Sequence, residues 1–245
     1  LGTGPYIDDM TIEGLCYGAL KFSDHPRAVV RRIDVSGAEK MTGVIRVFTG
    51  NDIPGKRYQG LIEKDWPMMV AEGETTRYIG DVLACVVADS EKIARQAVDD
   101  IKVEYQVLEP LTDMTQAADS QVRVHAGGNL LKKTVIRRGE PVDKVFERSA
   151  HVVEGVFETP FVEHAFLETE ASIVQPDGRG GLKVYSQSQG IYADREQIAS
   201  LLNLPLEKVD VIQVSAGGGF GGKEDLTVQH HAALCAMALQ CPVKV

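Results

Sequence analysis

The chain has 245 residues, of which 44% are apolar and 25% are charged, and its formal net charge is −9. This composition is typical of one large or two smaller globular domains and excludes a disordered chain. A net negative charge without a basic run longer than two residues argues against nucleic-acid binding, and no apolar run approaches the roughly 20 residues that span a bilayer.

The first hundred residues predict an α+β unit. Residues 29–36 and 43–50 have the β-branched content of strands and flank a short helical turn at 37–41. Residues 82–89, VLACVVAD, form a continuous apolar run that is typical of a buried strand. Residues 102–110, KVEYQVLEP, predict a further strand.

A helix is expected over residues 90–101, between the last two strands. Ser90 is a good N-cap residue, and Ile93, Ala97 and Ile101 fall on one helix face. This segment and its neighbours therefore predict a strand–helix–strand unit.

Residues 111–150 contain Gly, Pro and charge but little periodicity, so we expect a linker or a long crossing segment with a short helix at 142–148. Regular patterns then restart. Strands are predicted at 151–160, 181–188 and 208–214. Helices are predicted at 192–204, with Ile198, Leu201 and Leu202 on one face, and at 225–240.

The cysteines Cys16, Cys85, Cys235 and Cys241 form no C-x-x-C pair, which excludes an obvious zinc or iron–sulfur site in this chain. Their apolar surroundings predict reduced thiols and a reducing, cytoplasmic compartment. The chain begins with Leu1 and ends on CPVKV, which predicts the opening of a strand. We therefore expect a piece of a longer polypeptide, and the missing signal peptide is uninformative.

A glycine-rich stretch, GGGFGGKED, occupies residues 217–225. It fits both the dinucleotide pattern G-x-G-x-x-G and the phosphate-loop pattern G-x-x-x-x-G-K. The phosphate loop then needs Ser or Thr, where this chain has Glu224, and the dinucleotide pattern needs an acid about 20 residues later, where none occurs. A nucleotide-binding module that uses Lys223 stays an alternative.

The stretch is expected between the end of one strand and the start of a helix, where backbone N–H groups and the helix dipole favour an anion. A tight turn needs one or two glycines, whereas five of the six residues 217–222 are glycine. The excess indicates a functional loop.

Five blocks of the sequence occur in the order found in one known family. Together they resemble the large, molybdenum-binding subunit of the xanthine dehydrogenase and aldehyde oxidase family. The blocks are GTGPYIDDM, HPRAVVRRIDVSGAEKMTGVIRVFTGNDIPG, RYIGDVLACVVADS, EHAFLETE and AGGGFGGKED. The resemblance implies an α+β (α/β) fold with a hammerhead domain over residues 1–110, a linker over 111–150 and the truncated start of a molybdopterin-binding domain over 151–245.

The resemblance also implies site residues. The glycine loop is expected to lie against a molybdenum–pyranopterin cofactor, and Phe220 is expected to wall the substrate channel. Gln187 is a further candidate from SQSQ, with Gln189 as its alternative. The implied cofactor-binding residues are Gly219, Phe220, Gly221, Gly222 and Gln187.

Glu224 matches a glutamate that contacts the purine in xanthine-oxidising relatives, so Glu224 and Phe220 are the expected substrate-binding residues. A carboxyl group there can pair with ring nitrogens, although Glu224 could equally favour a helix N-terminus. One position departs from the family, because Val162 stands where a glutamine donates to a molybdenum ligand.

A protein-ligated metal is not expected. His164, Glu168, His230 and His231 are the residue types that bind metals, but adjacent histidines on a helix point in different directions and no third ligand has suitable spacing. The metal is therefore held through its pterin, without direct side-chain ligation.

The family implies hydroxylation of a purine or related N-heterocycle, such as xanthine or hypoxanthine, with oxygen from water. It also implies the cytosine dinucleotide form of the pterin, partner subunits or domains that carry [2Fe–2S] clusters and FAD, and a dimer of such heteromers. The catalytic base is expected downstream of this chain, so no catalytic residue is assigned within it. The alternatives are an aldehyde or aryl-thioester oxidoreductase and a non-catalytic assembly subunit.

Overall fold

The computed structural model describes residues 4–245. Contacts divide the chain into two compact units. The first comprises the chain up to Glu109 together with His164–Val245, and the second comprises Pro110–Glu163.

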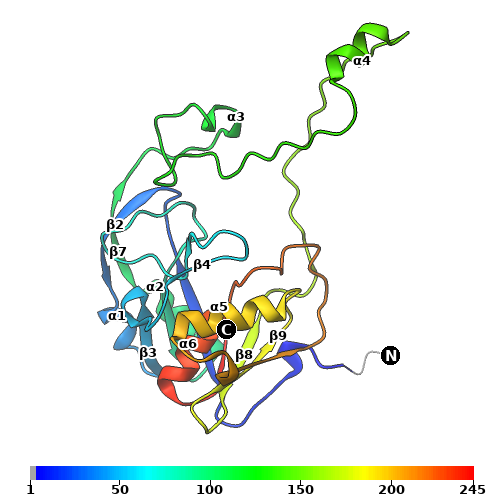
Figure 1. Cartoon of the computed structure of the whole chain (residues 1–245). Helices are drawn as coiled ribbons and strands as arrows, with labels where there is room; N and C mark the ends of the chain where they lie inside the picture. Colours follow the sequence, from blue (N-terminus) through cyan, green and yellow to red (C-terminus); the bar gives the residue numbers. More distant parts are fainter. Residues whose placement is uncertain (1–3) are drawn as a thin grey trace. The chain divides into compact units, whose positions relative to one another are not determined.

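The first unit is built on a seven-stranded mixed sheet with the order β10-β9-β8-β11-β1-β6-β3 (Figure 1). Its strands are β1 (Cys16–Phe22), β3 (Val44–Thr49), β6 (Val82–Ala88), β8 (Ser172–Pro176), β9 (Leu182–Ser186), β10 (Val209–Gln213) and β11 (Val243–Lys244). Pairs β10–β9 and β1–β11 are parallel, and the other pairs are antiparallel. Three strands come from the first 110 residues and four from the last 82, so one sheet joins two distant parts of the chain.

Strand β6 explains why its sequence is apolar at every position. Cys85 and Val87 belong to a core cluster that includes residues of α6 (Gln229–Leu239). Ala84 and Val86 belong to a different cluster, which includes Ala97 of α2. Side chains alternate between the faces of a strand, so β6 is covered on both faces and needs no polar position.

The helices of this unit follow their sequence signals. Helix α2 (Glu91–Asp99) begins after Ser90, whose hydroxyl accepts the Ile93 N–H at 3.3 Å. Helix α5 (Ile191–Leu202) buries Ile198, Leu201 and Leu202 in the same cluster as α6. The remaining helical turns are η1 (Ile7–Asp9), α1 (Ser36–Glu39), η2 (Gly50–Asp52) and η3 (Leu206–Lys208).

Two small antiparallel sheets complete the first unit. Strand β2 (Ala28–Asp34) pairs with β7 (Lys102–Val107), and β4 (Tyr58–Gln59) pairs with β5 (Trp66–Pro67). The predicted strand–helix–strand order is therefore present as β6, α2 and β7, but β7 lies in a different sheet from β6.

The second unit contains α3 (Met114–Ala117) and α4 (Val142–Arg148), the latter as predicted. The Asn129 side chain fastens its first part by donating to the carbonyls of Ala117 and Val122 at 2.8 Å and accepting the Val124 N–H at 2.8 Å. No helix within residues 4–245 is long and apolar enough to cross a membrane.

Two predicted elements were wrong. Residues 151–160 form no strand, and Val153 and Phe157 are more than 90% exposed. Alternation alone does not make a strand, because the backbone also needs a neighbour to pair with. The predicted helix at 225–240 begins only at Gln229, and residues 225–228 form a bend before it.

Candidate functional site

The glycine loop follows β10 and precedes α6. Its tightest part is a turn in which the Gly222 N–H donates to the Gly219 carbonyl at 2.8 Å. Phe220 has φ of 52° within this turn, a left-handed conformation that is uncommon for a residue with a side chain. Its ring is 74% exposed. Because α6 starts seven residues after Gly222, the loop is not at the helix N-terminus as predicted.

Close packing explains two of the glycines. A Cβ on Gly217 would lie 2.5 Å from the Cβ of Glu168, and a Cβ on Gly219 would overlap Oε1 of Gln189. The loop thus lies directly against the segment 164–169 on one side and against the end of β9 on the other.

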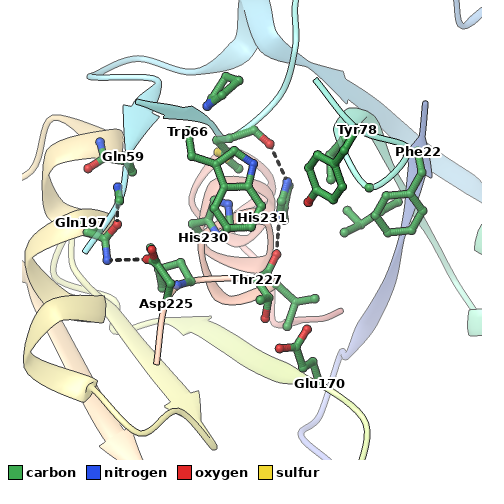
Figure 2. Close-up of a pocket in the computed structure, with 18 residues that line it drawn as sticks. Phe22, Gln59, Trp66, Tyr78, Glu170, Gln197, Asp225, Thr227, His230 and His231 are labelled. Carbon is green, nitrogen blue, oxygen red and sulfur yellow. Dashed lines mark hydrogen bonds between the residues drawn. The ribbon is translucent and has the colours of Figure 1, made fainter. Parts of the chain in front are cut away.

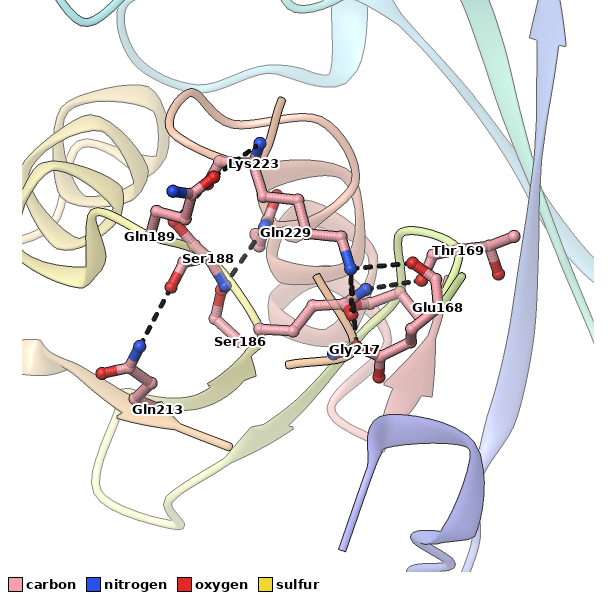
Figure 3. A network of polar contacts seen from close by, with 11 residues as sticks. Glu168, Thr169, Ser186, Ser188, Gln189, Gln213, Gly217, Lys223 and Gln229 are labelled. Carbon is pink, nitrogen blue, oxygen red and sulfur yellow. Dashed lines mark hydrogen bonds and ion pairs between the residues drawn. The ribbon is translucent and has the colours of Figure 1, made fainter. Parts of the chain in front are cut away.

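Lys223 anchors the loop from beneath (Figure 3). Its side chain is 2% exposed, and Nζ donates to the Glu168 carbonyl at 2.8 Å and to Gln187 Oε1 at 2.7 Å. The same ammonium lies 3.4 Å from Glu168 Oε2 and 4.5 Å from the centre of the Phe166 ring. All of its donors point into the protein, so Lys223 cannot reach a phosphate on the loop, which argues against the nucleotide-binding alternative.

Glu168 ties the start of the loop to this anchor. Its Oε2 accepts the Gly217 N–H at 2.7 Å, and its own N–H donates to the Gly217 carbonyl at 3.2 Å. Oε1 of the same carboxyl group is buried and has no hydrogen-bond partner within residues 4–245. A buried carboxylate oxygen without a donor is costly, so this atom points to a donor outside the described chain.

The two glutamines of SQSQ have different positions. Gln187 is 1% exposed, its Nε2 donates to the Thr169 carbonyl at 2.7 Å, and its Oε1 accepts from Lys223. Gln189 is exposed, and its Oε1 accepts the Gly221 N–H at 3.0 Å. Since both ends of the Gln187 amide are occupied, the geometry favours Gln189 as the glutamine beside a ligand.

Asp194 lies below the end of β9 and is completely buried. Its two oxygens accept from the hydroxyls of Ser186 at 3.0 Å and Ser188 at 3.1 Å. Burial raises the pKa of Asp194 to about 6, partly offset by the two serine hydroxyls, and the charge of Asp225 raises it further. The Ser188 hydroxyl also lies 3.1 Å from the Lys223 carbonyl, so this network reaches the glycine loop.

The backbone donors of the loop fall into two groups. The N–H groups of Gly217, Gly221 and Gly222 are bonded within the protein. Those of Gly218, Gly219 and Phe220 find no acceptor in the part of the chain that the structure describes. Three consecutive donors without an internal acceptor are a site for an acceptor-rich or anionic ligand.

A cavity of about 190 Å³ lies beside the segment that links the loop to α6 (Figure 2). It is lined by Phe22, Trp66 and Tyr78 from the first 110 residues and by Asp225 and Thr227 from the linking segment, among others. Asp225 Oδ2 accepts the Leu61 N–H at 3.1 Å, which joins this segment to the β4–β5 loop.

The histidines of α6 are buried against this cavity. The ring nitrogens of His231 face the carbonyls of Thr227 at 3.2 Å and Met68 at 3.1 Å. Burial lowers the pKa of His231 to about 4 and that of His230 well below its usual value. His164 instead lies beside Gly222, and residues 4–245 contain no group of three His, Cys, Asp or Glu side chains suited to a metal ion.

Glu224 is exposed at the end of the loop, on a residue adjacent to the buried Lys223. Val162, in the second unit, is 81% exposed. The expected contacts of Glu224 with a substrate and the effect of Val162 remain predictions. Sequence patterns gave no sign of the Lys223–Glu168 anchor, although the block EHAFLETE contains its second member.

Two protein-family profiles match the chain. The molybdopterin cofactor-binding domain matches residues 122–245, and the a/b hammerhead domain of aldehyde oxidase and xanthine dehydrogenase matches residues 1–109. The boundaries predicted at 110 and 150 remain a prediction.

Curated relatives cover nearly the whole chain. A probable xanthine dehydrogenase subunit from Bacillus subtilis is 35% identical over 98% of this chain and 32% of its own length. The nicotinate dehydrogenase large molybdopterin subunit from Eubacterium barkeri is 35% identical over 100% of this chain and 57% of its own length. The chain thus spans between about a third and just over half of these relatives.

Solved structures agree with this fold. Quinoline 2-oxidoreductase from Pseudomonas putida superposes with a TM-score of 0.85 at 29% identity, over 99% of this chain and 32% of that one. Aldehyde oxidoreductase from Desulfovibrio gigas gives a TM-score of 0.87 at 27% identity, over 99% and 28%.

Proposed function

The chain belongs to the xanthine dehydrogenase and aldehyde oxidase family, and we propose that it forms the cofactor-holding part of a molybdenum hydroxylase subunit acting on an N-heterocycle. One observation carries this proposal: the consecutive N–H groups of Gly218, Gly219 and Phe220 have no acceptor within residues 4–245.

The loop fits a molybdenum–pyranopterin, whose oxo and pterin oxygens are hydrogen-bond acceptors. Gly219 lets the backbone approach such atoms without a side chain between them, and Gln189 holds the far edge of the loop. The unpartnered Oε1 of Glu168 marks a further place for a donor. When bound, the cofactor supplies the two-electron redox chemistry, and this chain supplies orientation and a fixed set of donors.

The proposed substrate is a purine or related N-heterocycle. Xanthine dehydrogenase, nicotinate dehydrogenase and quinoline 2-oxidoreductase are relatives whose names specify aromatic N-heterocycles. The exposed carboxyl group of Glu224 can pair with ring N–H groups, and the exposed ring of Phe220 can cover a planar substrate. Both residues flank the proposed cofactor contacts, within five residues of Gly219.

We further propose that electrons leave through [2Fe–2S] and FAD partners. All four cysteines of this chain lie in two separate pairs, which leaves no set for a cluster. The cytosine dinucleotide form of the pterin, a dimer of heteromers and a cytoplasmic location belong to the same proposal.

The test compares Glu224→Ala with wild type in the complete enzyme, using dye reduction with xanthine, nicotinate and an aromatic aldehyde. The matched control is Glu196→Ala, which removes another exposed carboxylate, from α5. We expect Glu224→Ala to lower kcat/KM for the heterocycle by about 10- to 100-fold and to spare the aldehyde, because hydrogen bonds to charged groups contribute roughly 1.5–3 kcal/mol. Unchanged heterocycle kinetics would overturn the substrate assignment, and a preference for the aldehyde in wild type would support the aldehyde alternative.

A further inference from the structure

All four cysteines of the chain lie in two close pairs. Cys16 and Cys241 have their sulfurs 3.7 Å apart, and so do Cys85 and Cys235. In each pair one cysteine comes from the first 110 residues and the other from the last 82. Both pairs therefore cross the line along which these two parts of the chain share one sheet.

The sheet is narrowest at this line. Strands β1 and β11 pair at only two positions, Cys16 with Val243 and Tyr17 with Lys244, whereas β1 and β6 pair at six. One further backbone bond, from the Cys16 N–H to the Pro242 carbonyl at 2.9 Å, supports the junction. The Lys244–Asp8 ion pair at 3.1 Å lies near it, but Asp8 is 80% exposed, so this pair adds little.

We propose that Cys16 and Cys241 form a redox-sensitive disulfide that fastens β1 to the segment leading into β11. The sulfurs need to approach from 3.7 Å to roughly 2.0 Å, which rotation about the side-chain bonds can supply. The backbone is already held together beside the pair by the β1–β11 register.

The oxidant we name is a low-molecular-weight disulfide such as oxidised glutathione. The Cys16 thiolate attacks one glutathione sulfur and releases a glutathione thiolate, which takes up the proton that Cys16 lost. The Cys241 thiolate then attacks the Cys16 sulfur of this mixed disulfide and releases the second glutathione. Two protein thiols are oxidised, and one glutathione disulfide is reduced to two thiols.

Access separates the two pairs. Cys16 and Cys241 are both partly exposed, whereas Cys85 and Cys235 are completely buried between β6 and α6. A reagent of glutathione size can reach only the first pair. Burial and the neighbouring Cys16 thiol raise the pKa of Cys241 to about 11, so ring closure is slow at neutral pH and accelerates as the pH rises.

The test uses the full-length protein, incubated with oxidised glutathione at pH 7 and pH 9 and analysed by non-reducing peptide mass spectrometry. We expect a Cys16–Cys241 crosslink that forms faster at pH 9 and is absent in Cys16→Ser. Cys85→Ala is the matched control and keeps the crosslink. The bond closes a loop of more than 200 residues, so the oxidised protein is expected to melt at least about 5 °C higher than the reduced one.

Two results would overturn the proposal. One is a stable mixed disulfide on Cys16 without closure to Cys241 at either pH. The other is a crosslink confined to Cys85 and Cys235. Wild-type alkylation keeps the test decisive if a variant does not fold, because oxidation must protect two rapidly reacting thiols at once.

Discussion

Replacing Lys223 with methionine tests the anchor beneath the glycine loop most severely. Methionine keeps the unbranched shape but removes the ammonium, which leaves the buried Gln187 Oε1 and the Glu168 carboxylate without their donor. Breaking a buried ion pair by removing one partner costs roughly 3–5 kcal/mol. Glu168 is 16% exposed and keeps its bond from Gly217, so we expect about 2–4 kcal/mol here.

The assay is thermal unfolding of the purified protein, where a loss of that size lowers the Tm by roughly 5–15 °C. Lys183→Met is the matched control, because Lys183 is exposed on the neighbouring strand β9, and it should change the Tm little. Adding Glu168→Gln to Lys223→Met should recover part of the loss, since it removes the uncompensated charge. A Tm within about 1 °C of wild type for Lys223→Met would refute the anchor.

Two further predictions concern the residues around the loop. Asp194 has a folded-state pKa of about 6, above its unfolded value, so its contribution to stability is present below pH 4 and is lost as the pH rises through 6; Asp194→Asn should flatten the unfolding free energy between pH 4 and pH 7, and an unchanged pH slope would contradict the raised pKa. Gly219→Ala places a methyl group on Gln189 Oε1 and should destabilise the protein by about 1–3 kcal/mol while lowering cofactor content, whereas Gly73→Ala, at a glycine with open space around it, should leave cofactor content unchanged; equal cofactor loss in both variants would contradict the role of close approach.

Much of the fold was predictable because local signals and tertiary structure agree. Ser90 caps α2 as its sequence position predicts, and the unbroken apolar run of β6 reflects cover on both faces. Strand β1 was missed, because CYGALKF contains Gly and Lys and lacks clear alternation. Its place in the sheet comes from β6 and β11, which lie far away in the sequence.

The candidate site was predictable only in part. The glycine loop was found from its composition, but its anchor joins Lys223 to Gln187 and Glu168, which are 36 and 55 residues away. Pairings over such distances leave no periodic signal, so Lys223 was open to interpretation as a phosphate ligand until its side chain was seen to point inward. Gln187 and Gln189 were likewise indistinguishable until the register of β9 placed one in the core and the other at the surface.

The most direct test of the cofactor proposal is the molybdenum content of the full-length protein, purified with its partner subunits from a host that makes the pyranopterin. We predict stoichiometric molybdenum in wild type and in Lys183→Met, and a marked loss in Gly219→Ala. A well-folded wild-type complex without molybdenum would contradict the account and favour a non-catalytic assembly subunit.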